Sequence, residues 1–318
     1  MNRFQGAGKR PGRDPSLSSR LGTTRDGQPL SFNRQPASDL LPWVSCLYAA
    51  SVKAPDNYRL NCRLFNDASV IRIQLQGVWT AESRDGLRRH ERSALLFGPQ
   101  SKAMPVSVTG SFASVGIAMR PGACFKVLGK NMADFVDRIV DAADFGLPGG
   151  MAMEQLDLNG RPEDWLSQLE NSVREFLGRL QPEPPDRETL LFERLTLTDP
   201  NTPVADFAAQ HGIDQRKLER LVRRDFGMAP KQVLRRARAL DMASHLRGVA
   251  DAEEAAEVAL RYYDQSHLIR DFIELFGMSP KQFVQTPQPL LTSALESRQA
   301  WRLFEINRLA PGDARPWG

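Results

Sequence analysis

The stretch Phe226-Gly227-Met228-Ala229-Pro230-Lys231-Gln232-Val233 recurs, at an offset of 50 residues, as Phe276-Gly277-Met278-Ser279-Pro280-Lys281-Gln282-Phe283. The same offset needs no gap to align the residues before it, which include Asp214 with Asp264, Leu218 with Leu268 and Arg220 with Arg270. A match of this length at a fixed offset indicates that one structural unit occurs twice.

Both copies have the same local pattern. A short helix is followed by a tight turn, and an Asp at the next position, Asp214 or Asp264, can cap a second helix. Leucine and phenylalanine side chains then recur at helical spacing along one face of that helix. Gly227 and Gly277 can adopt the left-handed conformation that ends it. This order of elements is typical of a helix-turn-helix.

The outward face of each second helix carries side chains suited to DNA. Arginine can bond to two acceptors of guanine, and glutamine to adenine, in the major groove. A structural or nonspecific role has equal weight for Arg223, and also for Arg224, Arg235 and Arg236. The candidate DNA-binding residues are Arg216, Glu219, Arg220 and Arg223 in the first copy, and Gln265, Ser266, His267 and Arg270 in the second.

The two copies differ in charge. Residues 215–238 contain nine positive and two negative side chains, for a net charge of +7. Residues 251–285 contain three positive and seven negative side chains, for a net charge of −4. We therefore expect the first copy to supply most of the attraction to phosphates and the second to add positioning and base recognition.

Residues 190–286 resemble the AraC/XylS family of bacterial transcription regulators. The resemblance rests on the segment from Tyr262 to Phe272, on Phe276 to Phe283 and on a weaker first copy from Val204 to Val233. It implies two helix-turn-helix subdomains bridged by a long helix at Lys231–Arg247, with double-stranded promoter DNA and RNA polymerase as partners. Tyr262 stands where the family usually has Gly.

The resemblance also implies that the N-terminal region is a β-rich sensor half, loosely cupin-like, that binds a small-molecule effector or forms a homodimer. The residues agree with a β-rich region, because short strand-like stretches alternate with turn signals. These stretches are Tyr58–Phe65, Ser69–Gln76, Ser93–Phe97, Met104–Val108 and Ser111–Met119. Trp79, Phe97 and Phe112 could line a pocket there or simply pack in the core.

The predicted fold class is a multidomain α+β chain, with a β-barrel or sandwich-like domain and flanking helices before an all-α domain of two helix-turn-helix subdomains joined by a long helix. An amphipathic helix is expected at Glu163–Leu180. The role of a last helix, Leu290–Leu309, stays open between dimerisation and packing on the sensor domain. The predicted segments are a disordered tail (1–38), the β-rich domain (39–181), a Pro-rich linker (182–188), the DNA-binding domain (189–286) and a C-terminal helix and tail (287–318).

Composition excludes several other classes. The chain has no run of 18 apolar residues and no secretory signal, which favours a cytoplasmic location without membrane contact. Its three cysteines form no CxxC pair, and we expect buried, reduced thiols. His90 is the only histidine before residue 200 and is expected at the surface, so no metal site, cofactor or catalytic residue is predicted.

Three functions stay open at this point. The first is a transcription regulator that responds to a ligand, and the second is a constitutive DNA-binding regulator without one. The third is an enzyme whose β-rich domain is catalytic, although no nucleophile elbow, metal cluster or acid–base pair supports it. The sequence names neither an operator nor an effector, and it does not distinguish an activator from a repressor.

Overall fold

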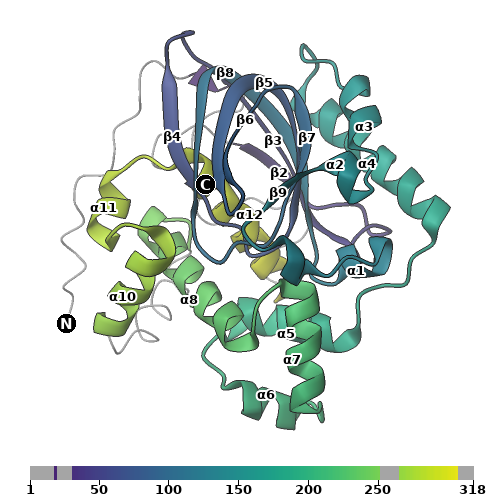
Figure 1. Cartoon of the computed structure of the whole chain (residues 1–318), viewed down its shortest axis with the longest axis vertical. Helices are drawn as coiled ribbons and strands as arrows, with labels where there is room; N and C mark the ends of the chain where they lie inside the picture. The colour runs from purple at the N-terminus through teal and green to yellow at the C-terminus, as the bar shows by residue number, and fades with distance from the viewer. Residues whose placement is uncertain (1–17, 20–30, 251–264, 307–318) are drawn as a thin grey trace.

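The computed structural model describes residues 18–19, 31–250 and 265–306, and Figure 1 shows a β-sheet with helices packed on both of its faces. The strands are β1 (Ser18–Ser19), β2 (Ser31–Arg34), β3 (Val44–Lys53), β4 (Arg59–Leu64), β5 (Val70–Ser83), β6 (Gly86–His90), β7 (Ser93–Phe97), β8 (Met104–Met119) and β9 (Ile139–Asp141). The helices that follow β8 are α1 (Ala123–Leu128), the 3₁₀ helix η1 (Met132–Phe135), α2 (Ala142–Phe145), α3 (Gly149–Gln155), α4 (Pro162–Leu180), α5 (Arg187–Thr198), α6 (Val204–Gln210), α7 (Gln215–Phe226), α8 (Pro230–Arg247), α10 (Gln265–Phe276), α11 (Pro280–Gln285) and α12 (Pro289–Glu305).

The described strands form one antiparallel sheet in the order β1-β3-β8-β5-β7-β9. Three further strands pair beside this path, β2 with β3, β4 with β8 and β6 with β5. The long strands β5 and β8 each change partner along their length, and the register of β5 shifts around Gly77, whose φ is 100°. The expected barrel is therefore wrong, because the sheet is open and its two end strands do not pair with each other.

Successive side chains along β3, β5 and β8 point to opposite faces of the sheet, and both faces are buried. One face presents residues such as Leu47, Ile71 and Ile117, which pack in one apolar cluster with Phe145 and Trp165 from the helices that precede residue 181. Helix α4 lies against β3 and β8 on this face. The helices that follow the β8 strand thus cover this side without closing the sheet into a barrel.

The opposite face meets the C-terminal half of the chain. There Phe65, Trp79 and Phe112 share an apolar cluster with Leu240 of α8, Phe272 of α10 and other buried residues of α11 and α12. Helix α12 packs on β3 and β4 as well as on α5 and α8. Both halves of the chain therefore contribute to one core. The last helix, α12, packs on the sheet.

Several predicted elements have different bounds. The stretches expected at Met104–Val108 and Ser111–Met119 form the single strand β8, since Gly110 adopts a φ of 72° without ending the ladder. Ser31–Arg34, in the segment expected as a tail, pairs with β3. Residues 181–186, in the Pro-rich segment, lie outside helices and strands.

The first helix-turn-helix consists of α6 and α7. The Asp214 side chain accepts a hydrogen bond from the Lys217 backbone N–H (2.8 Å), which caps α7 as predicted. Gly227 ends α7 in the left-handed conformation with a φ of 80°. The bridge predicted at Lys231–Arg247 is α8. In the second copy the structure describes α10 and α11, whereas Tyr262, Asp264 and the segment predicted as the preceding helix lie outside the described residues.

Candidate nucleic-acid interface and cavity

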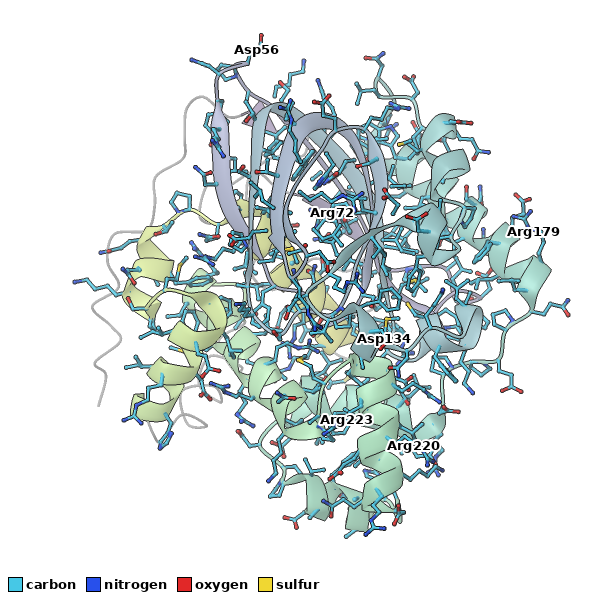
Figure 2. All side chains as sticks on the ribbon, viewed as in Figure 1. Asp56, Arg72, Asp134, Arg179, Arg220 and Arg223 are labelled. Carbon is cyan, nitrogen blue, oxygen red and sulfur yellow. The ribbon has the colours of Figure 1, made fainter. Side chains whose placement is uncertain are left out.

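Helix α7 presents a row of exposed side chains. Leu218 and Val222 are fully buried in the core that α7 shares with α5, α6 and α8. On the opposite side Arg216, Glu219, Arg220 and Arg223 are all exposed. Figure 2 shows Arg220 and Arg223 on the outer side of α7, in the part of the molecule farthest from the sheet. Among the described side chains, none forms an ion pair with these three arginines.

Five of the nine cations counted in the first copy are already engaged within the protein. Lys217 pairs with Glu188 at 2.6 Å, and Arg224 pairs with Asp186 at 2.6 Å while its guanidinium stacks 3.9 Å from the centre of the Phe125 ring. The other three are Arg235, Arg236 and Arg238, which bond to α10, to buried carbonyls and to the Pro200 carbonyl. The net charge of +7 therefore overstates what the first copy offers to DNA. Its exposed cations without an ion pair to a described residue are Arg216, Arg220, Arg223 and Lys231.

Helix α10 is the corresponding element of the second copy. His267 and Arg270 are exposed, and Gln265 begins the helix together with Ser266. Arg235 of α8 pairs with Asp271 at 2.8 Å and bonds to Glu274 at 2.9 Å, so two acidic groups of this copy are neutralised. These contacts also fix α10 against α8, which lies between α7 and α10 in Figure 1.

A cavity of about 110 Å³ lies between the sheet and the C-terminal helices. Strands β3, β5 and β8 form its floor. Its walls come from α5, α8 and α12, including Val233 and Ala237 of the bridging helix and Ala294 and Trp301 of the last helix. A molecule in this cavity would touch both halves of the chain.

Tyr48, Gly116 and Arg72 form one row across the floor, because Gly116 of β8 pairs with Tyr48 on one side and Arg72 on the other. The Arg72 guanidinium lies 5.4 Å from the centre of the Tyr48 ring and 5.2 Å from that of Phe97. A Cβ at Gly116 would come within 2.5 Å of the Tyr48 hydroxyl, so glycine leaves the space through which Tyr48 reaches toward Arg72. This row places a cation at the floor of the cavity.

The polar atoms of this row lack partners. Arg72 is 6% exposed, yet its Nε and the Tyr48 hydroxyl are buried without a hydrogen bond in the described part of the chain. Burial raises the pKa of Tyr48, so that its hydroxyl stays protonated and can donate. A buried polar atom without a hydrogen bond lowers the stability of the fold.

The other charges around the cavity are largely matched. Asp67 bonds to Arg298 at 3.0 Å, and Glu193 accepts from the Arg120 Nε at 2.9 Å. Arg236 differs, since it is 1% exposed and donates only to the backbone carbonyls of Gln100 (2.9 Å) and Asp67 (2.6 Å) among the described groups. Burial lowers the pKa of Arg236 to about 10, which still leaves it charged at neutral pH.

Two family models match the chain. A helix-turn-helix domain matches residues 207–286, the segment that contains most of α6 and all of α7, α8, α10 and α11. This domain is of the AraC type, in agreement with the motifs at Tyr262–Phe272 and Phe276–Phe283. The chain carries a helix-turn-helix domain and is a DNA-binding transcription regulator. A domain of unknown function, DUF6597, matches residues 33–141 and so spans the sheet of this regulator from β2 to β9.

Solved structures with a similar arrangement include ToxT from Vibrio cholerae. An apo ToxT variant from strain SCE256 is 11% identical, with 86% of this regulator and 98% of that chain covered and a TM-score of 0.42. ToxT from strain O395 bound to (E)-4-(8-methylnaphthalen-1-yl)but-3-enoic acid is 9% identical over 85% and 98%, with a TM-score of 0.43. The AraC-like transcriptional activator CuxR is 14% identical over 67% and 86%, with a TM-score of 0.27. No curated protein matches the regulator.

The DNA-binding role of the residues on α7 and α10 stays a prediction, whereas the sequence analysis did not identify the floor of the cavity. Phe112 lines the cavity, whereas Phe97 lies under Arg72 and Trp79 packs in the core. His90, expected at the surface, is 9% exposed because β6 pairs along β5 and places it opposite Trp79. The signal for the Tyr48–Gly116–Arg72 row was an arginine inside the apolar alternation of β5, which only the strand register could connect with Tyr48.

Three further properties bear on the sequence predictions. Cys46, Cys62 and Cys124 are all buried, and none of them forms a disulfide with another described residue. Among the described helices, none combines the length and the apolar character needed to cross a membrane. Within the described residues, no cluster of histidine, cysteine and acidic side chains is arranged to hold a metal ion.

Proposed function

We propose that this regulator reads promoter DNA with the exposed faces of α7 and α10, and that a small molecule in the cavity between the sheet and the C-terminal helices controls this binding. The observation that carries the first part is the set of exposed arginines without ion pairs on α7, together with Arg270 on α10. Arginines of this kind are free to bond to guanine edges and to phosphates.

The cavity supports the second part of the proposal. Its walls include α8, the helix that joins the two helix-turn-helix units, and its floor belongs to the N-terminal sheet. A ligand there would contact the element whose position sets the spacing of α7 and α10. A ligand that binds one position of α8 more tightly than another shifts the protein toward that position. The spacing of α7 and α10, and with it the affinity for DNA, then changes. A constitutive regulator would bind DNA with the same affinity whether or not a small molecule is present.

DNA binding is tested with fragments from upstream of the regulator's own gene, by fluorescence anisotropy at moderate salt. Replacement of Arg220 or Arg270 with Ala should weaken specific binding by about 1 to 3 kcal/mol, because each removes a base-reading side chain. Arg179→Ala is the matched control, since Arg179 is exposed on α4, far from α7 in Figure 2. Unchanged affinity in both Arg220→Ala and Arg270→Ala would contradict the assignment of these readers.

The charge argument gives a second check in the same assay. Arg224→Ala removes an arginine that is paired with Asp186 and stacked on Phe125, so it should reduce stability more than the salt dependence of DNA binding. Arg216→Ala removes an exposed cation and should reduce the slope of log affinity against log salt by about one. An unchanged slope in Arg216→Ala would mean that Arg216 does not contact a DNA phosphate.

A further inference from the structure

We propose that a second cavity, on the face of the sheet turned away from the C-terminal helices, binds small uncharged apolar molecules, and that helix α1 transmits its occupation to α7. This outer cavity lies between the strands β5 and β8 and the helices α1, α3 and α4. Three observations carry the proposal: the position of the outer cavity, the chemistry of its walls and the contacts that α1 makes on its other side.

The outer cavity is separate from the one between the sheet and the C-terminal helices. Its volume is about 50 Å³, and no described residue lines both cavities. Strand β5 divides them, because successive side chains of a strand point to opposite faces of the sheet. Val70 and Arg72 line the first cavity, whereas Ile71 and Ile73 line the outer one. A molecule in the outer cavity would therefore contact a different face of the sheet.

The described walls of the outer cavity carry no charge. Its lining residues are apolar except for Cys124 and Ser172. Burial raises the pKa of the Cys124 thiol to about 12, so the thiol stays neutral. The Ser172 hydroxyl donates to the Gln168 backbone carbonyl (3.0 Å) and is thus already bonded within α4. Because an ion would lose its hydration here without gaining a partner of opposite charge, the cavity discriminates against charged ligands.

Water is also a poor occupant of the outer cavity. A buried water needs roughly 10 to 15 Å³ and two to four polar partners, and apolar cavities of about 150 Å³ bind benzene or xenon instead. The outer cavity has room for water, but its described walls offer no set of polar atoms to hold it. An apolar molecule needs no such partners and restores the dispersion contacts that an empty space lacks. Val173 and Phe176 line the cavity and are only half-buried, which places this side of it near solvent.

Helix α1 connects the outer cavity with the first helix-turn-helix. Its Val127 and Leu128 line the cavity. Its Phe125 ring contacts α7, since the Arg224 guanidinium lies 3.9 Å from the centre of that ring. Because α1 is only six residues long, a ligand that displaces Val127 and Leu128 also displaces Phe125. Occupation of the cavity therefore changes the support of α7.

The ligand class is tested on the intact regulator, without DNA, by isothermal titration calorimetry. The probes are benzene and toluene, with benzoate and benzylamine as charged molecules of similar size. We expect toluene to bind at least about ten-fold more tightly than either charged molecule, since neither would find an opposite charge in the outer cavity. Equal affinities for toluene and the two charged molecules would overturn the proposal without any variant.

Variants locate the bound molecule. Val173→Phe places a ring in the outer cavity and should lower the affinity for toluene by about ten-fold or more. Val284→Phe is the matched control, because Val284 is a half-buried valine on α11 that lines neither cavity. If Val173→Phe does not fold, Ser172→Leu fills the cavity from its half-buried edge and should weaken toluene binding in the same way. Unchanged toluene affinity in the folded variant would overturn the assignment of the site.

Transmission to α7 is tested in the DNA-binding assay. Toluene near saturation should change the DNA affinity of the wild type by about five-fold or more, and Val173→Phe should abolish that change. Toluene binding without any change in DNA affinity would overturn the transmission through α1. The proposed reading of DNA by α7 is judged separately, since Arg220→Ala impairs DNA binding whether or not toluene binds.

Discussion

His90 shows how the position of one side chain determines its ionisation. Burial, with the positive charges of Arg88 and Arg72 nearby, lowers the pKa of His90 from 6.5 to about 4. The folded protein therefore keeps this imidazole neutral at pH values where the unfolded chain protonates it. Since the unfolded state binds the extra proton, the free energy of unfolding must fall as the pH drops from about 6.5 to about 4.

The pH dependence can be assigned to this residue by substitution. In the wild type, His90 should remove up to about 3 kcal/mol of stability over that pH interval. His90→Gln cannot titrate, so its stability should fall less steeply over the same interval, whatever its value at neutral pH. Urea unfolding at a series of pH values measures both curves. Parallel curves for the two proteins would show that His90 does not have the lowered pKa.

At the scale of the element, α12 is the part of the C-terminal half that is most deeply integrated. Leu291 and Leu295 are fully buried against the sheet and α8. Arg298 joins three separate segments, since it bonds to Asp67 after β4, to Asp241 of α8 and to the Thr196 carbonyl of α5. The helix therefore packs on the N-terminal sheet, and packing on that domain is one of the two roles that the sequence left open.

The energetic role of α12 can be measured at Arg298. Replacement of Arg298 with Ala leaves Asp241, which is 3% exposed, without its closest cation, and should lower the free energy of unfolding by about 3 to 5 kcal/mol. Arg194→Ala, at an exposed position of α5, is the control and should stay within about 0.5 kcal/mol of the wild type. Chemical denaturation gives both values, and similar stability of the two variants would mean that the buried network contributes little.

The elements also show what the sequence could predict. The helix at Glu163–Leu180 and the strand at Ser93–Phe97 follow from local sequence patterns and agree with α4 and β7. The bridge at Lys231–Arg247, which the family resemblance implied, agrees with α8. Local patterns do not contain the pairing of distant strands, so neither the open sheet nor the Tyr48–Gly116–Arg72 row could be predicted. Charge counting failed for a similar reason, because Arg224, Arg235 and Arg236 of the basic segment are bonded to residues far away in the sequence.

At the scale of the whole molecule, the Pro-rich segment 182–188 divides the sequence into two parts. The two parts nevertheless share one hydrophobic core. The second helix-turn-helix shares an apolar cluster with the sheet, and the backbone N–H of Ala103, just before β8, donates to the Leu275 carbonyl of α10 (2.7 Å). The first unit has its own cluster around Phe192, Leu218 and Phe226. The sheet is therefore in direct packing contact with α10 as well as with α8.

This shared core leads to the last prediction. Phe65, after β4, and Phe276, at the end of α10, are both buried and meet edge to face with ring centres 5.1 Å apart. Phe65→Ala and Phe276→Ala should each lower the free energy of unfolding by about 3 to 5 kcal/mol in one common transition. The double variant should lose less than the sum of the two, since either single substitution already removes the ring contact.

The test follows amide hydrogen exchange in peptides from β4 and from α10 during chemical unfolding. In a molecule with one core, either substitution increases exchange in both peptides, because losing one ring destabilises the packing of the other. In a molecule whose halves unfold separately, Phe65→Ala would affect β4 alone and Phe276→Ala would affect α10 alone. Phe145→Ala is the comparison, since Phe145 packs on the opposite face of the sheet, and its effect should add fully to that of Phe276→Ala.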